Sequence, residues 1–196
     1  MKSIRISDKT MKQSERLSLS FSERIELARL LDRLGVDYIE LEGIRNQRTD
    51  ALGIKAIASA VTSSAISVPI ELTDPESPAR VMAALVGAKR ARLQVVAPTG
   101  VAQIEYLYHK KPDAMLETVT AAVSACRKLC SDVELVCEDA TRADLTYLSR
   151  MIASAVSAGA GTVTLSDTAG VLIPSEVEGF LSSVCKETDV SIGYIS

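Results

Sequence analysis

The sequence predicts an α/β protein of the parallel type, an incomplete TIM-type (β/α) barrel. Extended apolar stretches alternate with amphipathic helical ones at a spacing of about 30 residues, with little antiparallel signal. Right-handed crossovers would then place the helices outside a parallel sheet, either doubly wound or closed into a barrel. The barrel is favoured because about seven strands are expected, more than the five or six typical of doubly wound sheets, and because no strand-to-helix turn carries a glycine-rich dinucleotide fingerprint. A complete barrel needs eight units and about 250 residues, so this chain is short by roughly one unit.

The expected strands and helices follow from hydrophobic periodicity and from the residues that typically begin or end them. "KSIRIS" alternates as the first strand, and "SERIELARLLDRLG" follows as a helix with Ser22 as its N-cap and Gly35 as its stop. The further expected strands are "VDYIELE", "ISVPIELT", "ARLQVVAP", "VELVCED", "GTVTLSDT" and "DVSIGYIS". The further expected helices cover 49–61, 78–86, a longer region whose second part runs from Pro112 to Cys130, 143–158 and 174–186.

Composition and charge limit the domain count and the partners. A chain of 196 residues with 47% hydrophobic content buries one sizeable core, so residues 1–196 are expected to form a single partial-barrel domain. The net charge of −3 is scattered rather than gathered in runs, which predicts neither nucleic-acid nor membrane binding. Small molecules or other proteins are the expected partners. No apolar run approaches the roughly 20 residues of a spanning helix, and a cytoplasmic location is expected.

The cysteines and the one histidine give no metal signature. Cys126, Cys130, Cys137 and Cys185 show no C-x-x-C spacing, so packed free thiols are expected rather than a metal site. His109 lies in the polar "YHKKP" stretch and is expected at the surface.

Functional side chains of parallel α/β folds lie after the carboxyl ends of the strands. The polar residues at those places in this sequence are Asp8, Lys12, Gln13, Glu40, Glu42, Glu71, Thr73, Thr99, Glu138, Asp139, Arg142, Ser166, Asp167 and Thr168. Glu40 and Glu42 lie two apart on a strand and therefore share a face, where a hydrogen-bonding role is preferred to a general acid/base pair. Carboxylates and hydroxyls are thus expected to gather on one rim.

Four segments in order resemble one enzyme family. "FSERIELARLLDRLGVDYIEL", "TGVAQIEYLYHKKPDAMLETV", "EDATRADLTYL" and "AGAGTVTLSDTAG" are similar to the pyruvate carboxyltransferase-type barrel of isopropylmalate, homocitrate and citramalate synthases. The resemblance spans nearly the whole chain and implies the N-terminal part of such a catalytic domain. It further implies a Claisen condensation of acetyl-CoA with a 2-oxo acid bound to a divalent metal, Mg²⁺, Mn²⁺ or Zn²⁺.

The sequence departs from the family at the residues that carry this chemistry. When "DKTMKQSER" is laid on the family's D-x-T-L-R-D-G-x-Q motif, Lys12 falls on the catalytic Arg and Gln13 on the metal-binding Asp. Lysine keeps the charge without the planar fork of arginine, and a neutral amide is a poor ligand for a hard cation. The family's H-x-H falls near Tyr194 and Ser196, and a further family histidine is Gln103. No residue is therefore assigned as a metal ligand, and metal binding is expected to be weak or absent.

Other positions match. The resemblance assigns Thr168, with Ser166 beside it in "SDTAG", to the carboxylate of the 2-oxo acid, and Glu138 to an acidic position near the substrate. Lys12 is the candidate catalytic residue, as a partner for an oxyanion, or else a solvated rim residue. Asp139, Thr141, Arg142 and Asp144 are interpreted as a helix-capping and ion-pair set rather than as reacting groups.

Two functions remain open. One is a divergent condensing synthase whose last unit and metal ligands come from another chain or from sequence absent here. The other is a catalytically inactive barrel that binds a 2-oxo acid or serves as a regulatory or partner subunit. A parallel sheet that ends at a seventh strand exposes an edge, so a homo-oligomer or a partner chain that completes the barrel is expected in either case.

Overall fold

The computed structural model describes residues 4–13, 19–46, 48–184 and 190–196. The strands follow one another in the order β1-β2-β3-β4-β5-β6-β7. They are Ser7–Asp8, Tyr38–Glu40, Ala65–Pro69, Ala91–Pro98, Val133–Glu138, Thr162–Ser166 and Ser191–Ile195. The pairs β1–β2, β2–β3, β5–β6 and β6–β7 are parallel, so the expected parallel sheet is confirmed.

The described helices lie in the predicted regions and differ from them by one or two residues at their ends; residues 185–186, the predicted end of the last helix, lie outside the described residues. The α-helices are α2 (Phe21–Leu34), α3 (Thr49–Ala60), α4 (Ser77–Ala84), α5 (Val101–Leu107), α6 (Pro112–Leu129), α7 (Leu145–Ala158) and α8 (Pro174–Val184), with short 3₁₀ turns η1 (Thr10–Gln13) and η2 (Ala140–Arg142). The long region predicted after the fourth strand is two helices, and the second begins at Pro112 as expected. None of the described helices is long and apolar enough to cross a membrane.

One predicted helix start is wrong. The N-cap of α2 is Ser20, not Ser22: the Ser20 side chain accepts from the Glu23 backbone N–H, and the Glu23 carboxylate accepts from the Ser20 backbone N–H. This reciprocal pair is a capping box, which needs an acid three residues after the cap. Gly35 ends the helix in the left-handed conformation, as predicted.

The chain divides into two compact units. The first holds Met1–Glu71 and Glu76–Leu93, and the second holds Leu72–Pro75 and Gln94–Ser196. The expectation of a single domain over 1–196 stays a prediction, and each unit is described by itself.

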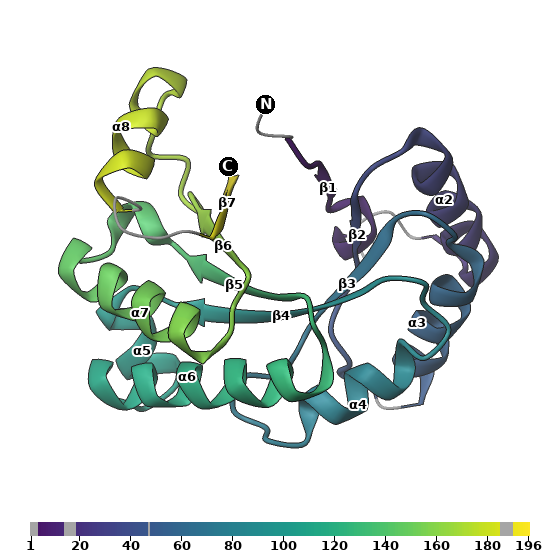
Figure 1. Cartoon of the computed structure of the whole chain (residues 1–196), viewed down its shortest axis with the longest axis horizontal. Coiled ribbons are helices and arrows are strands. Elements are labelled where there is room, and N and C mark those ends of the chain that lie inside the picture. Colours follow the sequence, from purple (N-terminus) through teal and green to yellow (C-terminus); the bar gives the residue numbers. More distant parts are fainter. Residues whose placement is uncertain (1–3, 14–18, 47, 185–189) are drawn as a thin grey trace. The chain divides into compact units, whose positions relative to one another are not determined.

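In the first unit, α2 packs on α3 and α3 on α4, beside the strands β1 to β3 (Figure 1). The turn before β3 is held by Asp32, whose carboxylate accepts from the N–H groups of Thr62 (2.8 Å) and Ser64 (2.7 Å). Burial raises the pKa of Asp32, but the hydrogen bonds from Ser64, Thr62 and Ser63 outweigh it and hold the pKa well below its usual range. A charged side chain from α2 thus fixes the entry to β3.

In the second unit, α6 and α7 lie side by side and both contact β5 (Figure 1). Parallel register pairs Thr164 with Gly193 and Leu165 with Tyr194. Since paired residues point to the same face of a sheet, β5 and β6 together have a polar face and an apolar face. The polar face carries Glu134, Thr164 and Ser166, and the apolar face carries the fully buried Leu135 and Leu165.

Candidate functional site

The rim of the first unit is an ion pair on β2. Lys12 Nζ lies 3.1 Å from Glu40 Oε2, and the two side chains are 25% and 3% exposed. The hydroxyl of Ser7 on β1 donates to the other carboxylate oxygen, Glu40 Oε1, at 2.7 Å. Lys12 is therefore not a freely solvated rim residue: its charge is balanced by a buried carboxylate on the neighbouring strand.

The other motif residues of this rim have local roles. Asp8 accepts from the backbone N–H of Thr10 at 2.9 Å and from its hydroxyl at 3.1 Å, which shapes the turn into η1. Gln13 is exposed at the end of η1, and only Met11 of that turn is buried. Glu40 and Glu42 do not act as a pair, because Glu40 is bound by Lys12 and Glu42 lies beyond the end of β2, in the lining of a separate pocket.

The rim of the second unit is built on hydroxyls. Thr168 Oγ1 accepts from the backbone N–H of Asp139 at 3.0 Å and lies 3.3 Å from Ser166 Oγ. Each hydroxyl has a single proton, so whichever of the pair donates to the other, one O–H remains to donate to a ligand. Thr168 is exposed and Ser166 is half-buried, so this donor is open to solvent. The structure therefore brings Thr168 and Ser166 together, and their role in binding a substrate stays a prediction.

Glu138 is the last residue of β5, and the residue that follows it is hydrogen-bonded to this hydroxyl pair. Its backbone carbonyl accepts from the buried Thr99 hydroxyl at 2.6 Å, which ties the end of β4 to the end of β5. Its neighbour Asp139 is the residue whose N–H donates to Thr168. The Glu138 side chain is half-buried at the carboxyl end of the polar face.

Asp139, Arg142 and Asp144 make the cap and ion-pair contacts interpreted from the sequence, whereas the Thr141 hydroxyl donates to Asp167 instead. Arg142 Nη2 lies 2.6 Å from Asp139 Oδ2, and Asp144 caps α7 by accepting from the Tyr147 N–H at 2.8 Å. The hydrogen bond and the charge of Asp139 raise the pKa of Arg142. Asp139 has a positive φ of 58°, a left-handed conformation that aspartate adopts more readily than most residues other than glycine. In this conformation the backbone N–H of Asp139 donates to the Thr168 hydroxyl.

Asp167 organises the sixth loop. Its carboxylate accepts from the N–H groups of Val171 (3.0 Å) and Leu172 (2.9 Å) and from the hydroxyls of Thr141 (2.7 Å) and Tyr194 (3.3 Å). The two backbone hydrogen bonds are the main reason that the pKa of Asp167 falls to about 2; burial opposes them, and the two hydroxyls add to them. With four donors around it, this carboxylate positions the loop that holds Thr168.

The last strand does not bring the counterparts of the H-x-H motif to the polar face. Tyr194 pairs with Leu165, so its side chain points to the apolar face, where its hydroxyl meets Asp167. Burial and the charge of Asp167 raise the pKa of Tyr194. The polar face of β7 carries Gly193 and Ile195 instead, and Ser196 is exposed beyond the strand. A Cβ at Gly193 would lie 2.5 Å from Thr164 Oγ1, so this position has no room for a side chain unless Thr164 moves.

Sequence reasoning missed a buried polar cluster below this rim. Glu134 accepts from Gln94 Nε2 at 2.8 Å and from the Thr164 hydroxyl, and the three residues are at most 5% exposed. The signal was present, since a glutamine and a glutamate interrupt the apolar strands "ARLQVVAP" and "VELVCE" at positions that share the polar face. A fully paired cluster of this kind fixes strand order and orientation in a low-dielectric interior.

The residues described do not fit the metal that the resemblance implies. Gln13 offers an exposed amide, Glu40 is bound by Lys12, and the polar face of β7 carries no ligand atom at Gly193 or Ile195. Within the described ranges, no three His, Cys, Asp or Glu side chains form a group able to hold a metal ion. Divalent cations need several oxygen or nitrogen ligands converging at one point.

Fold and site together define a parallel β/α protein of the barrel type with polar groups at the carboxyl ends of its strands. The chain belongs to the HMGL-like family, whose model matches residues 4–194. The family predicted from the sequence is confirmed.

Curated relatives agree with this family. The chain is 36% identical over 172 residues to a 2-isopropylmalate synthase of Caulobacter vibrioides, covering 86% of this chain and 33% of that protein. It is 32% identical over 190 residues to a 2-isopropylmalate synthase of Heliobacterium modesticaldum, covering 95% of this chain and 37% of that protein. The chain thus spans about a third of the length of these relatives.

Solved structures establish the fold. An HMG-CoA lyase from Brucella melitensis has a TM-score of 0.74 at 14% identity, covering 99% of this chain and 72% of that chain. An HMG-CoA lyase from Bacillus subtilis has a TM-score of 0.70 at 17% identity, covering 90% of this chain and 61% of that chain. These neighbours are TIM barrels, so the predicted incomplete (β/α) barrel is confirmed.

Proposed function

We propose that this chain binds a 2-oxo acid through the Thr168 and Ser166 hydroxyls and acts as a binding or partner subunit rather than as a metal-dependent synthase. The observation that carries the proposal is the hydroxyl pair itself, in which the Asp139 N–H occupies an acceptor site of Thr168 and one O–H is left for a ligand. A carboxylate accepts hydrogen bonds only, so it is the natural partner for such a donor. The half-buried Glu138 is given no contact in this proposal, because a 2-oxo acid has no N–H or O–H group to donate to its carboxylate.

The altered metal positions support binding without the family's chemistry. The family reaction condenses acetyl-CoA with a 2-oxo acid whose carbonyl is polarised by a divalent metal. In this chain the position of the catalytic Arg holds Lys12, already paired with Glu40, and the position of the metal-binding Asp holds the exposed Gln13. We therefore expect weak or absent binding of Mg²⁺, Mn²⁺ and Zn²⁺.

A divergent synthase remains the second candidate, because Lys12 keeps a positive charge that is 25% exposed at the position of the family's catalytic residue. In that case Lys12 would stabilise an oxyanion, and the metal ligands would come from elsewhere. Acetyl-CoA would be the co-substrate, and its consumption releases a free thiol that is easily assayed.

The test is titration calorimetry of 2-oxoisovalerate and pyruvate into the purified chain, with and without each metal. We expect metal-independent binding that falls at least about tenfold in the double variant Ser166→Ala/Thr168→Val, which removes both hydroxyls of the pair. Thr146→Val, at an exposed threonine on α7, is the matched control and should bind as the parent chain does.

Each other outcome has a definite meaning. Binding that requires a metal would indicate a rebuilt metal site and favour the synthase, to be followed by the thiol-release assay with Lys12→Met. No binding of either acid by the folded chain, with or without metal, would refute the proposal.

A partner is proposed from the edge of the first unit. β1 has only two residues and stands first in the strand order, and the preceding Ile4 and Ile6 are 92% and 60% exposed. Exposed apolar side chains beside an edge strand favour association with a second copy or with a chain that completes the barrel. Light scattering at micromolar concentration should show a species larger than the monomer, and a monodisperse monomer would contradict this.

A further inference from the structure

The first unit contains a pocket that the proposed function does not use. It has a volume of about 310 Å³ and lies between η1, the beginning of α2, the end of β2 and α3. Its lining residues are Met11, Leu19, Phe21, Arg24, Leu41, Glu42, Gly43, Thr49, Asp50, Gly53, Ile54 and Ile57. A volume near the lower end of the range for ligand sites suits a small metabolite.

Most of the lining is apolar and part of it is open to solvent. Met11, Leu41 and Ile54 are buried side chains, so they form a floor. Phe21 lines the pocket and is 55% exposed, so part of its apolar surface is left in water. A ligand with an apolar body would remove this surface from water, which favours binding.

Two opposite charges line the same pocket without neutralising each other. The described part of the chain contains no ion pair between Arg24 and Glu42, and the one hydrogen bond of the Arg24 guanidinium is from Nε to the Leu19 carbonyl at 3.3 Å. The second carboxylate of the lining, Asp50, is committed, because it accepts from the N–H groups of Arg45 (2.9 Å) and Asn46 (2.6 Å). Both charged side chains line the pocket and are half-buried.

We infer that this pocket binds a small zwitterion with an apolar body, an α-amino acid with an unbranched or branched aliphatic side chain. The guanidinium of Arg24 receives the ligand carboxylate, Glu42 receives the ammonium group, and the side chain lies on the floor made by Met11, Leu41 and Ile54. A ligand carrying a single charge would satisfy one of the two protein charges and leave the other without a partner. The inference is independent of the hydroxyl site in the second unit.

The test uses L-norleucine with two analogues that each lack one charge, hexanoate and pentylamine, in titration calorimetry with the whole chain. We expect norleucine to bind at least about tenfold more tightly than either analogue. Glu42→Gln should remove the preference over hexanoate, and Arg24→Gln the preference over pentylamine. Arg24→Lys retains the charge and should retain most of the affinity.

A pocket-filling variant separates the site from unspecific binding. A Cβ added at Gly53 would meet only Phe21 Cε2, at 3.9 Å, so Gly53→Leu can place its side chain in the pocket without a backbone clash. Replacing a helical glycine raises helix propensity, so the fold should persist, and binding of norleucine should be lost. Gly179→Leu on α8, where a Cβ would meet nothing within 4 Å, is the matched control and should bind normally.

The outcomes that overturn the inference are distinct. Equal affinity for hexanoate and norleucine would show that Glu42 does not recognise an ammonium group. Unchanged binding of norleucine in Gly53→Leu would show that the ligand binds outside this pocket. No binding of norleucine by the folded chain would show that the pocket does not bind aliphatic amino acids.

Discussion

The rims of the two units use their polar side chains in opposite ways. In the first unit the two charged groups bind each other, Lys12 to Glu40 at 3.1 Å, with Ser7 completing the carboxylate. In the second unit the charged groups, Asp167 and Asp139, bind the backbone and Arg142, and they leave the Thr168 and Ser166 hydroxyls for a ligand. A rim whose charges are mutually neutralised is a structural element, whereas a rim whose charges position uncharged donors can still bind a ligand.

The largest effect is expected from breaking the pair in the first rim. Lys12→Met removes the cation that lies 3.1 Å from the Glu40 carboxylate, whose side chain is 3% exposed, and should lower the free energy of unfolding by about 3 kcal/mol. This is the lower end for buried pairs, because Lys12 is partly exposed. In the double variant Lys12→Met/Glu40→Gln no charge remains to be stabilised, so the loss should be smaller than the sum of the two single losses. Urea unfolding measures all four states of this cycle.

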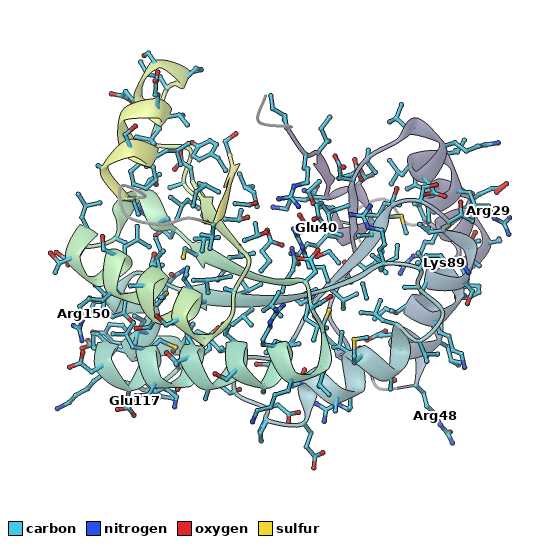
Figure 2. The ribbon with its side chains drawn as sticks, in the orientation of Figure 1. Arg29, Glu40, Arg48, Lys89, Glu117 and Arg150 are labelled. Atoms are coloured by element: carbon cyan, nitrogen blue, oxygen red, sulfur yellow. The ribbon has the colours of Figure 1, made fainter. Side chains whose placement is uncertain are left out.

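A surface pair supplies the control for that cycle. Arg29 and Glu26 lie one turn apart on α2 at 3.5 Å, with side chains 55% and 64% exposed. Figure 2 shows Arg29 on the outer side of α2, whereas Glu40 lies on β2 among other side chains. Arg29→Met should change stability by no more than about 0.5 kcal/mol. A Lys12→Met loss as small as this would mean that the first rim is solvated and not a structural element.

The next effect tests the polar face of β7. Gly193→Ala places a Cβ 2.5 Å from Thr164 Oγ1, and Thr164 is held by the buried Glu134, so the variant should lose about 1–3 kcal/mol. Gly161→Ala is the control, because a Cβ there meets nothing within 4 Å. Equal thermal midpoints for the two variants would show that β7 can shift, and with it that a metal ligand could be accommodated at 193.

The third prediction concerns the dependence of stability on pH in the acid range. The folded-state pKa of Asp167 is lowered to about 2, below its ordinary value of 3.8. A depressed pKa contributes stability that is fully present above the unfolded value and is lost as pH falls through the folded value. Between pH 4 and about 2 the parent chain should therefore lose stability that Asp167→Asn does not lose. Parallel acid dependence of the two chains would show that Asp167 does not hold the sixth loop by its charge.

The fold was predictable because hydrophobic periodicity and the residues that begin and end helices are local features of the sequence. The run "ARLQVVAP" is the strand β4 from Ala91 to Pro98 as predicted, and Gly35 and Pro112 end and begin their helices. The hydroxyl pair was also predictable, since Ser166 and Thr168 lie two apart at the end of one strand.

The rest of the site depends on contacts between distant parts of the chain. Lys12 and Glu40 are separated by 28 positions, and nothing in either segment states that the two side chains meet. The face on which Tyr194 lies is set by the register of β7 on β6, and a shift of one residue would exchange it with Gly193. Sequence pattern fixes which residues are polar, and register decides which of them face each other.

The smallest effect on stability is expected at two serines near the start of α2, because the residue type alone does not show which of them is the N-cap. Ser20→Ala removes the acceptor for the Glu23 N–H and half of the capping box, and should lower the free energy of unfolding by about 1 kcal/mol. Ser22, the cap predicted from the sequence, is in the first turn of α2, and Ser22→Ala should change stability by no more than a few tenths of a kcal/mol. The two variants share one substitution type on one helix end, so their difference in urea midpoint isolates the cap. A larger loss in Ser22→Ala than in Ser20→Ala would make Ser22 the cap, although the residue three positions later, Ile25, has no side-chain acceptor for a reciprocal hydrogen bond.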